Sequence, residues 1–366
     1  MPSPFIVTTV SVTDVLRVSP SFVRVTFRGD ELADFGTVGA AWDQRIKLIF
    51  PPESGVLPAI VGADAWWDAW RTLPEESRGS MRTYSIRDLV GEGDERRLVV
   101  DFVLHLVPGA TGPASTWAAA AGRGDALLVV GPRRSSTEGG GIEFAPGDAD
   151  HIVLAGDETA VPAMARILAD LPDDASGAAF LEVPESADID ELVAPAGIAL
   201  HWLPRDGAAV GSRLLPRVVE HLGGRADDAR FALELAARTA TRDAARGGTS
   251  VARGTATRDA ARGGTSVAQG TAVVGTMADT DATDREDAAA ADEEITDEEI
   301  WETPTHPAAD GQLPAASPGI PGLYAWIAGE SGVVTAIRRH LVRDLGVDRG
   351  QVAFMGYWRE GVAMRA

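Results

Sequence analysis

Alternating apolar and polar positions mark the first part of the chain as a series of short β-strands. Residues 6–30 alternate with period two and close on a Gly-Asp turn, as half-buried strands do. Further strands, separated by glycine and proline, are predicted at Arg45–Phe50, Arg82–Arg87, Leu98–Leu106 and Ala126–Val130. Many short strands at close spacing are typical of a small antiparallel barrel. We therefore predict an antiparallel β-barrel domain over residues 1–146.

The pattern changes after a stretch of Gly, Pro and Asp at Gly139–Asp150, which we interpret as a linker. Compact apolar strands are predicted at His151–Ala155, Ala178–Val183, Ile198–Leu203, Leu323–Ala328 and Val352–Tyr357. Helical segments lie between them, at Thr159–Leu171, weakly at Asp188–Val193, and at Ser331–Leu345. Alternation of strand and helix predicts a parallel sheet covered by helices, so residues 147–366 form an α/β domain.

The α/β pattern is interrupted by a tandem repeat and an acidic block. Residues 241–256 recur at 257–272 with one change, Arg253 to Gln269. Residues 279–302 then hold twelve acidic residues against Arg285 alone. Gly, Thr, Ala and charges with few aromatics cannot bury enough apolar surface to order a chain. We predict a disordered insertion at about 238–295 in a surface loop.

Composition excludes several classes of chemistry. The 366 residues include no cysteine, which excludes disulfides, thiolate zinc sites and cysteine-ligated iron–sulfur clusters. The six histidines have no paired spacing, so no protein-built metal site is predicted. Redox chemistry would therefore need an organic cofactor.

Charge and hydropathy bear on partners and location. A net charge of −21 argues against a nucleic-acid partner, which would need clustered Lys and Arg. The start of the chain has no basic region of an export signal, and no apolar run reaches the ~18–20 residues of a membrane span. We expect a cytoplasmic monomer without membrane insertion.

The strongest local motif is Arg82-Thr-Tyr-Ser-Ile-Arg87 on a predicted strand. Its chemistry suits a bound flavin, since Tyr84 can stack on the ring and Ser85 can reach the flavin N5 region. The planar forks of Arg82 and Arg87 match a pyrophosphate. Strand alternation puts Arg82 and Tyr84 on one face and Ser85 and Arg87 on the other. A strand with an ordinary exposed arginine pair is the alternative.

Three further motifs follow in order. Asp101-Phe-Val-Leu-His105 ends a strand, and Gly112-Pro-Ala-Ser-Thr-Trp117 opens a helix whose free amides and dipole favour a phosphate. Gly156-Asp-Glu-Thr-Ala-Val-Pro-Ala163 reads as a tight turn after a strand, with Thr159 as N-cap and Pro162 in the first helical turn. No Gly-x-Gly-x-x-Gly dinucleotide fingerprint is present, and a plain strand-to-helix turn is the alternative reading.

The four motifs in this order closely resemble the siderophore-interacting proteins, an FAD-dependent branch of the ferredoxin-reductase-like superfamily. Tyr324–Glu330, Arg338–Leu341 and Gly356–Arg359 also look like that family, so the resemblance covers about 1–236 and 300–366. It implies FAD contacts at Arg82, Thr83, Tyr84, Ser85, Arg87, Asp101, His105, Gly112, Ala114, Ser115 and Trp117. It implies that NAD(P)H meets the turn at Gly156, Asp157, Glu158, Thr159 and Ala160.

The implied activity is NAD(P)H-dependent reduction of ferric siderophores with release of ferrous iron. The chemistry lies on the flavin, so no catalytic side chain is predicted. Lys47, the sole lysine, matches a barrel-strand lysine of the family, and Arg134 and Arg359 are further candidates to bind an anionic siderophore. Glu182 could bind the ribose of NADH, whereas Arg205 could meet the 2′-phosphate of NADPH, and family grounds favour NADPH.

Three alternatives stay open. The chain could be a general flavin-dependent NAD(P)H reductase of another acceptor, since one fold hosts several activities. It could be a siderophore-binding accessory protein without turnover, or an interaction protein that works through its acidic insertion. Deleting about 238–295 separates the last reading from the others, because flavin content and reductase activity are expected to survive.

Overall fold

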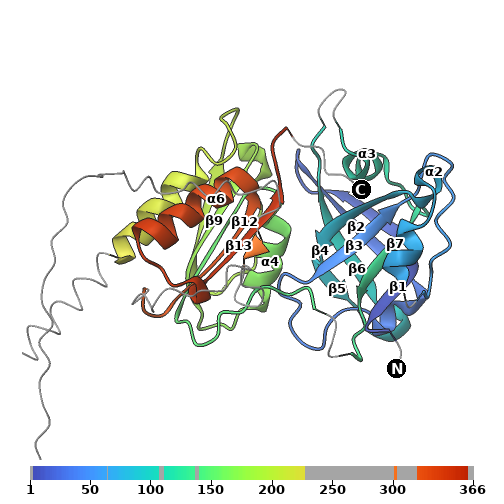
Figure 1. The fold of residues 1–366 in the computed structure, drawn as a ribbon, viewed down its shortest axis with the longest axis horizontal. Helices are drawn as coiled ribbons and strands as arrows, with labels where there is room; N and C mark the ends of the chain where they lie inside the picture. Colours follow the sequence, from blue (N-terminus) through green and yellow to red (C-terminus); the bar gives the residue numbers. More distant parts are fainter. Residues whose placement is uncertain are drawn as a thin grey trace, which may run out of the picture. The chain divides into compact units, whose positions relative to one another are not determined.

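The computed structural model describes residues 3–63, 65–106, 111–136, 140–226, 301–302 and 320–361 (Figure 1). Residues 1–230 and 299–366 form one compact unit. The insertion predicted at 238–295 lies outside the described residues.

The first sheet is antiparallel and seven-stranded, in the order β4-β3-β7-β1-β2-β6-β5. Its strands are β1 Phe5–Arg17, β2 Phe22–Arg28, β3 Arg45–Phe50, β4 Ser80–Ser85, β5 Asp88–Val90, β6 Arg97–Val103 and β7 Ala126–Pro132. The pairing leaves β4 and β5 as the two edges, so the sheet is a half-barrel and not a closed ring. All seven strands fall within the domain predicted over residues 1–146.

Both faces of this half-barrel are covered. Alternate residues such as Val10, Val25 and Phe27 form an inner apolar cluster, which α3 (Pro113–Ala120) joins through Ala114 and Ala118. The opposite face is covered by α1 (Trp66–Arg71), whose Trp70 is buried. The short helix α2 (Glu75–Arg78) follows α1 in the chain. The hydrophobic pattern of this covering segment predicts neither helix. Short 3₁₀ turns complete the region at Asp30–Asp34 (η1) and Gly93–Glu95 (η2).

The second sheet has six strands in the order β10-β9-β8-β12-β13-β11, all parallel except β11. The strands are β8 His151–Gly156, β9 Ser176–Val183, β10 Gly197–Pro204, β11 Trp301–Glu302, β12 Leu323–Glu330 and β13 Val352–Trp358. This is the predicted parallel sheet, and strand order reverses between β8 and β12.

Helices cover both faces of this sheet (Figure 1). α4 (Val161–Asp170) packs with Ile152 and Leu154 on one face. On the other face, Val153 and Ala155 pack with α6 (Ser331–Arg339) and with the helical residues 214–226. A π-helical turn at His340–Asp344 (η4) extends α6, and 3₁₀ turns lie at Ser186–Asp188 (η3) and Arg349–Gln351 (η5).

Two local predictions are wrong. The weak helix at Asp188–Val193 is absent: the 3₁₀ turn ends at Asp188, whose carboxylate accepts the amide of Glu185 and the hydroxyls of Ser19 and Ser21. Thr159 is not the N-cap of α4, because its hydroxyl donates to Asp157 and Ala160 takes that position. Over residues 140–150, the segment interpreted as a linker forms no helix or strand.

Two aspartate carboxylates, the buried Asp43 and the largely buried Asp170, join the two sheets within this compact unit. Asp43, just before β3, accepts the amides of Glu143 (3.1 Å) and Phe144 (3.0 Å), and Nε1 of Trp326 in β12 (2.9 Å). Asp170, at the end of α4, accepts the amides of Ala41 and Trp42 at 2.8 and 2.9 Å. These contacts join residues a hundred or more positions apart in sequence.

Candidate functional site

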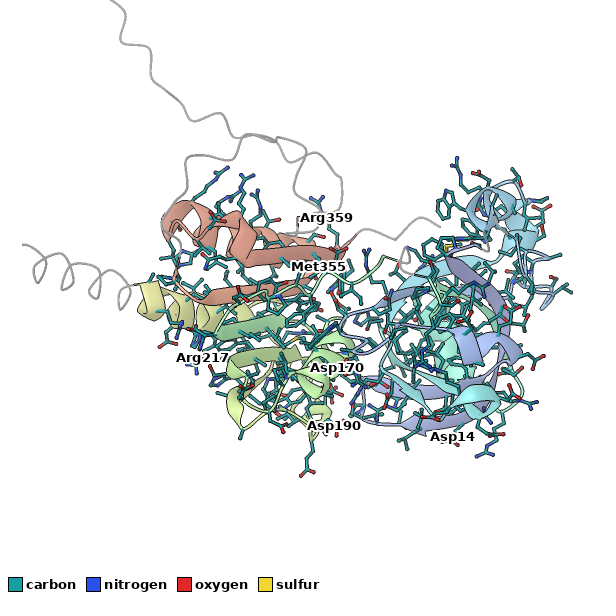
Figure 2. The ribbon with its side chains drawn as sticks, turned by 90° about the horizontal axis from the view of Figure 1, so that it is seen from below. Asp14, Asp170, Asp190, Arg217, Met355 and Arg359 are labelled. Atoms are coloured by element: carbon teal, nitrogen blue, oxygen red, sulfur yellow. The ribbon has the colours of Figure 1, made fainter. Side chains whose placement is uncertain are left out.

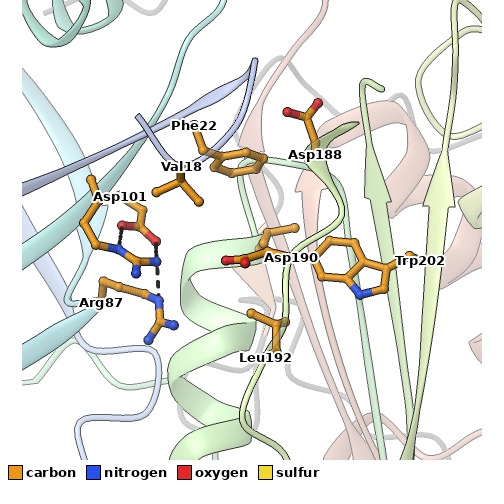
Figure 3. Close-up of a pocket in the computed structure, with 10 residues that line it drawn as sticks. Val18, Phe22, Arg87, Asp101, Asp188, Asp190, Leu192 and Trp202 are labelled. Atoms are coloured by element: carbon orange, nitrogen blue, oxygen red, sulfur yellow. Dashed lines mark hydrogen bonds and ion pairs between the residues drawn. The ribbon is translucent and has the colours of Figure 1, made fainter. Parts of the chain in front are cut away.

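Arg87, directly after β4, is held beside Asp101 of β6 (Figure 3). Asp101 makes a bidentate pair with Arg24 of β2 at 2.6 and 2.8 Å, and its Oδ2 lies 3.4 Å from Arg87 Nε. Arg87 Nε is buried and has no hydrogen-bond acceptor among the described residues. Asp101 thus positions two guanidinium groups, one of which keeps unused donor capacity.

The pocket beside this pair is small. Its lining residues come from the half-barrel part and from the parallel-sheet part of the chain. Figure 3 labels Val18, Phe22, Arg87, Asp101, Asp188, Asp190, Leu192 and Trp202. Its volume is about 20 Å³, which is room for about one water molecule. The pocket itself is therefore no cavity for a large ligand, and the significance of Arg87 lies in its unsatisfied donor.

The aromatic residues of the predicted flavin motifs gather in the inner cluster of the half-barrel. Tyr84 packs on Phe102 with ring centroids 4.7 Å apart, and Trp117 of α3 packs on Phe50 and Phe102 at 5.5 and 5.8 Å. Tyr84 and Ile86 lie on this inner face, as strand alternation predicted. Thr83 lies on the opposite face, where its hydroxyl meets Lys47 Nζ at 2.5 Å.

The N-terminus of α3 has no side-chain cap and no acidic residue in its first turn. Gly112 is the N-cap with Pro113 following, and Ala114 is buried. Ser115 Oγ lies between the carbonyl of Val103 (3.2 Å) and the amide of His105 (3.4 Å), which ties this helix to the end of β6. A helix end without a competing carboxylate suits an anionic group.

The turn after β8 is occupied by its own acidic residues. Asp157 Oδ2 accepts the amide of Glu330 at 2.7 Å and Nε1 of Trp358 at 2.8 Å. Asp157 Oδ1 accepts the amide of Thr159 at 2.9 Å. The Asp157 carboxylate therefore bridges β8, β12 and β13 at the point where strand order reverses.

Glu158 faces both the half-barrel and β10. Its carboxylate takes Arg205 as a bidentate partner at 2.6 and 2.8 Å, and it lies 3.2 Å from His105 Nε2. The His105 ring packs against Trp358 with centroids 5.6 Å apart. His105, predicted as a flavin contact, and Glu158, predicted as a nicotinamide contact, are therefore direct neighbours.

The two adjacent carboxylates of the turn have very different pKa values. Burial, with the nearby Glu158 charge second, raises the pKa of Asp157 to about 6. Burial opposes ionisation of Glu158 as well, but the hydrogen bonds from Arg205 and His105 outweigh it and lower the pKa of Glu158 to about 2. Glu158 is thus the fixed charge, and Asp157 is the group that can change near neutral pH.

Glu182 and Arg205, the two residues weighed for cofactor choice, are both engaged inside the protein. Glu182 is fully buried and accepts the amides of Gly211 (2.7 Å), Arg213 (2.9 Å) and Leu214 (3.0 Å). Arg205 bonds Glu158 and lies 3.3 Å from Glu182. Neither side chain can reach a ribose or a phosphate without breaking these bonds.

The predicted siderophore-binding cations come from three elements. Lys47 is on β3, and Arg134 is exposed after β7. Arg359, labelled in Figure 2, is exposed after β13. Their joint role stays a prediction.

Arg24 and Trp358 were missed as site residues. Arg24 carries no motif, and its position opposite Asp101 in the β2–β6 register is a tertiary fact. Trp358 lay within Gly356–Arg359, a segment noted for its resemblance, but its bond to Asp157 joins positions 201 residues apart. Among the described residues, no helix is long and apolar enough to cross a membrane, and no cluster of three His, Asp or Glu could hold a metal ion.

Comparison with known proteins matches both halves of the chain. The family model described as siderophore-interacting protein matches residues 149–361, and that of the siderophore-interacting FAD-binding domain matches residues 11–136. The ferric vibriobactin reductase of Vibrio cholerae is 33% identical over 195 residues, which is 52% of this chain and 63% of that protein. The NADPH-dependent ferric-chelate reductase of Escherichia coli is 32% identical over 206 residues, covering 55% of this chain and 72% of that protein.

A solved structure agrees over the whole length. The crystal structure of a siderophore utilization protein from T. fusca matches with a TM-score of 0.55 and 26% identity, covering 99% of this chain and 96% of that one. The alignment with the Vibrio protein spans less than two thirds of that protein's length.

Proposed function

Because this chain belongs to the siderophore-interacting protein family, we propose that it is an FAD-dependent reductase that carries electrons from NAD(P)H to ferric siderophores. The observation that supports this most directly is the FAD-binding domain over residues 11–136, with its motif residues on β4, β6 and α3. The relatives named as ferric reductases support the reaction. The proposal keeps the cytoplasmic location and the monomeric state expected from the sequence.

The described residues suit FAD as the cofactor. The Arg87 guanidinium is held beside Asp101 through its buried Nε, and the first turn of α3 has no acidic residue and no side-chain cap. A guanidinium and an uncapped helix end are both groups that suit a pyrophosphate. Tyr84 belongs to a rigid aromatic cluster that can support the ring system. When bound, FAD supplies the redox chemistry, accepting two electrons together and releasing them singly, which no side chain of this cysteine-free chain offers.

The protein's own part is to bind and orient. Asp101 holds Arg87 and Arg24 in place, and Ser115 ties α3 to the end of β6. Lys47, Arg134 and Arg359 are proposed to attract the anionic ferric siderophore, whose iron takes a single electron and leaves as ferrous iron because siderophores hold it weakly. No general acid or nucleophile is needed for this transfer.

The proposal is tested by absorbance spectroscopy under anaerobic conditions. Purified protein should show flavin bands that bleach on adding NADPH or NADH and recover on adding a ferric siderophore, while a ferrous-specific chelator reports the released iron. Protein that stays colourless after incubation with FAD would overturn the proposal, and so would reduced flavin that no ferric siderophore reoxidises.

A variant links the reaction to the motif. Arg87→Ala should weaken FAD binding about tenfold or more, because a charge-assisted hydrogen bond to phosphate is lost. Arg97→Ala is the matched control: Arg97 begins β6, and its partner Glu95 is exposed. FAD affinity equal in the two variants would remove Arg87 from the site.

A further inference from the structure

Asp157 closes the crevice in which an α/β sheet of this order normally holds a ligand. Such ligands sit beyond the carboxyl ends of the strands, where strand order reverses, which here is between β8 and β12. Asp157 Oδ2 spans this point to the amide of Glu330 and to Trp358. Gly329 has φ +140°, and a Cβ there would lie 2.6 Å from Asp157 Oδ2, so the carboxylate packs directly on the β12 backbone.

The N-terminus of α4, the usual seat of a dinucleotide pyrophosphate, is also occupied. The Asp157 side chain takes the amide of Thr159, and the Asp157 carbonyl takes the amides of Ala160 (2.9 Å) and Val161 (3.2 Å). Pro162 has no amide hydrogen to donate. The turn that would donate several backbone bonds to a phosphate has these donors satisfied or missing.

The helices that follow β10 and β12, unlike α4, are capped by carboxylate side chains. Glu182 of β9 accepts the amides of Gly211, Arg213 and Leu214, at the start of the helical residues 214–226. Glu330, the last residue of β12, is the N-cap of α6 and accepts the amide of Val333 at 2.9 Å. A carboxylate of this chain therefore stands where a phosphate would bind at each of these helix ends.

The consequence is electrostatic as well as steric. Carboxylates at the carboxyl ends of β8, β9 and β12 repel a pyrophosphate. Arg205, a cation beside these carboxylates, is already bonded to Glu158 and Glu182. The N-terminus of α3 has no acidic residue in its first turn and no side-chain cap, so this helix end stays suited to an anion.

We propose that this chain selects its electron donor by the dihydronicotinamide ring and not by the pyrophosphate, with Asp157, Glu182 and Glu330 keeping phosphates off the carboxyl edge of the sheet. The inference deepens the proposed reductase function and rests on it. The class of donor is then reduced nicotinamides in general, the mononucleotide included, with little distinction between NADPH and NADH.

Equilibrium binding tests this without turnover. Calorimetric titration of the FAD-loaded protein with 2′,5′-ADP, the phosphate-bearing half of NADPH, should find no binding tighter than about 1 mM. A micromolar dissociation constant would overturn the inference.

Rapid mixing gives a second readout. Flavin bleaching by NADPH and by reduced nicotinamide mononucleotide should differ by no more than about tenfold in second-order rate constant. A pyrophosphate clamp would add about tenfold or more for each charge-assisted bond. An advantage of NADPH above about 100-fold would therefore contradict the proposal.

The variant Glu330→Gln keeps an oxygen that accepts the Val333 amide but removes the charge. It should tighten 2′,5′-ADP binding by about threefold to tenfold and leave bleaching by the phosphate-free 1-benzyl-1,4-dihydronicotinamide within about twofold. Glu53→Gln, a neutralised exposed carboxylate after β3, is the matched control and should change neither. Unchanged 2′,5′-ADP binding in Glu330→Gln would count against the electrostatic argument.

Failure of this inference is distinguishable from failure of the function. Flavin reduced by dithionite needs no nicotinamide, and its reoxidation by a ferric siderophore tests the reductase alone. A protein that passes this test yet binds 2′,5′-ADP tightly would retain its function and lose the inference.

Discussion

At the scale of single residues, Arg205 is the ion-pair partner of two buried carboxylates. Glu158 is 2% exposed and Glu182 is fully buried, and Arg205 is bonded to both. Removing one partner of a buried ion pair costs far more than the pair contributes, because a charge is left without compensation. Arg205 is thus a structural residue of the edge and not a free phosphate binder.

Arg205→Leu should lower the free energy of unfolding by about 3–5 kcal/mol at pH 7, measured by urea denaturation. Arg217→Leu is the control, because Arg217 forms an exposed pair with Glu220 and should cost about 0–1 kcal/mol. Similar losses in the two variants would show that the buried network contributes little.

The raised pKa of Asp157 predicts that the stability of the protein depends on pH. Its pKa rises to about 6 in the folded protein because of burial and the Glu158 charge, against about 3.9 in an unfolded chain. Between these values the folded state binds the proton more tightly, so the contribution of Asp157 to stability falls as pH rises from about 4 to 6.

Asp157→Asn removes this titration. The stability of the natural protein relative to Asp157→Asn should therefore fall by up to about 3 kcal/mol between pH 4 and 6, followed by urea denaturation at each pH. Glu158 does not confuse the comparison, since its lowered pKa shifts its own stability loss to below about pH 4.5. Parallel pH profiles for the two proteins would contradict the assignment.

At the scale of elements, the contact of β8 with β12 sets the geometry of the edge. Ala328 pairs with Gly156, and one step further Asp157 lies on Gly329. Glycine is needed there on two counts, since the position has positive φ and lacks room for a Cβ.

Gly329→Ala should cost about 2–4 kcal/mol of unfolding free energy, because the new methyl group must displace the Asp157 carboxylate. Gly39→Ala is the matched control: it also has positive φ (+95°) but no atom within 4 Å of the added Cβ, so about 1–2 kcal/mol is expected from the backbone alone. Thermal or urea denaturation measures both, and equal losses would rule out the packing argument.

At the scale of the whole molecule, three aspartates join the half-barrel to the parallel sheet within a single compact unit. Asp43 joins the start of β3 to Trp326 of β12, Asp170 joins α4 to Trp42, and Asp188 joins η3 to Ser21. Each carboxylate satisfies several donors at once, so removing it strands all of them. We expect the two sheets to unfold together.

Asp43→Ala leaves the amides of Glu143 and Phe144 and the Trp326 indole without an acceptor. The expected loss is about 3–5 kcal/mol, and hydrogen exchange should quicken in β3 and β12 together. Asp14→Ala, which removes an exposed partner of Arg123, is the control and should stay within about 1 kcal/mol. Exchange that quickens in one sheet alone would show that the sheets are uncoupled.

Local sequence patterns were enough to predict the strands of the two sheets and the order of the cofactor motifs. Period-two alternation in β1 and β2 and short apolar runs in β8, β9 and β12 are local signals, because burial of one or both strand faces is written in neighbouring residues. The start of α3 could also be predicted from local sequence, because a glycine followed by a proline is a common start of a helix. The boundaries of α4 were not, because Thr159 bonds Asp157 in place of capping the helix.

The bonding partners of the charged residues are evident only from the tertiary structure. Glu182 and Arg205 looked available for a ribose or a phosphate, yet they bond the segment at 211–214 and Glu158. Asp157 and Trp358 meet across 201 positions of sequence. A side chain's partner depends on which distant strands lie side by side, and no local pattern encodes that distance.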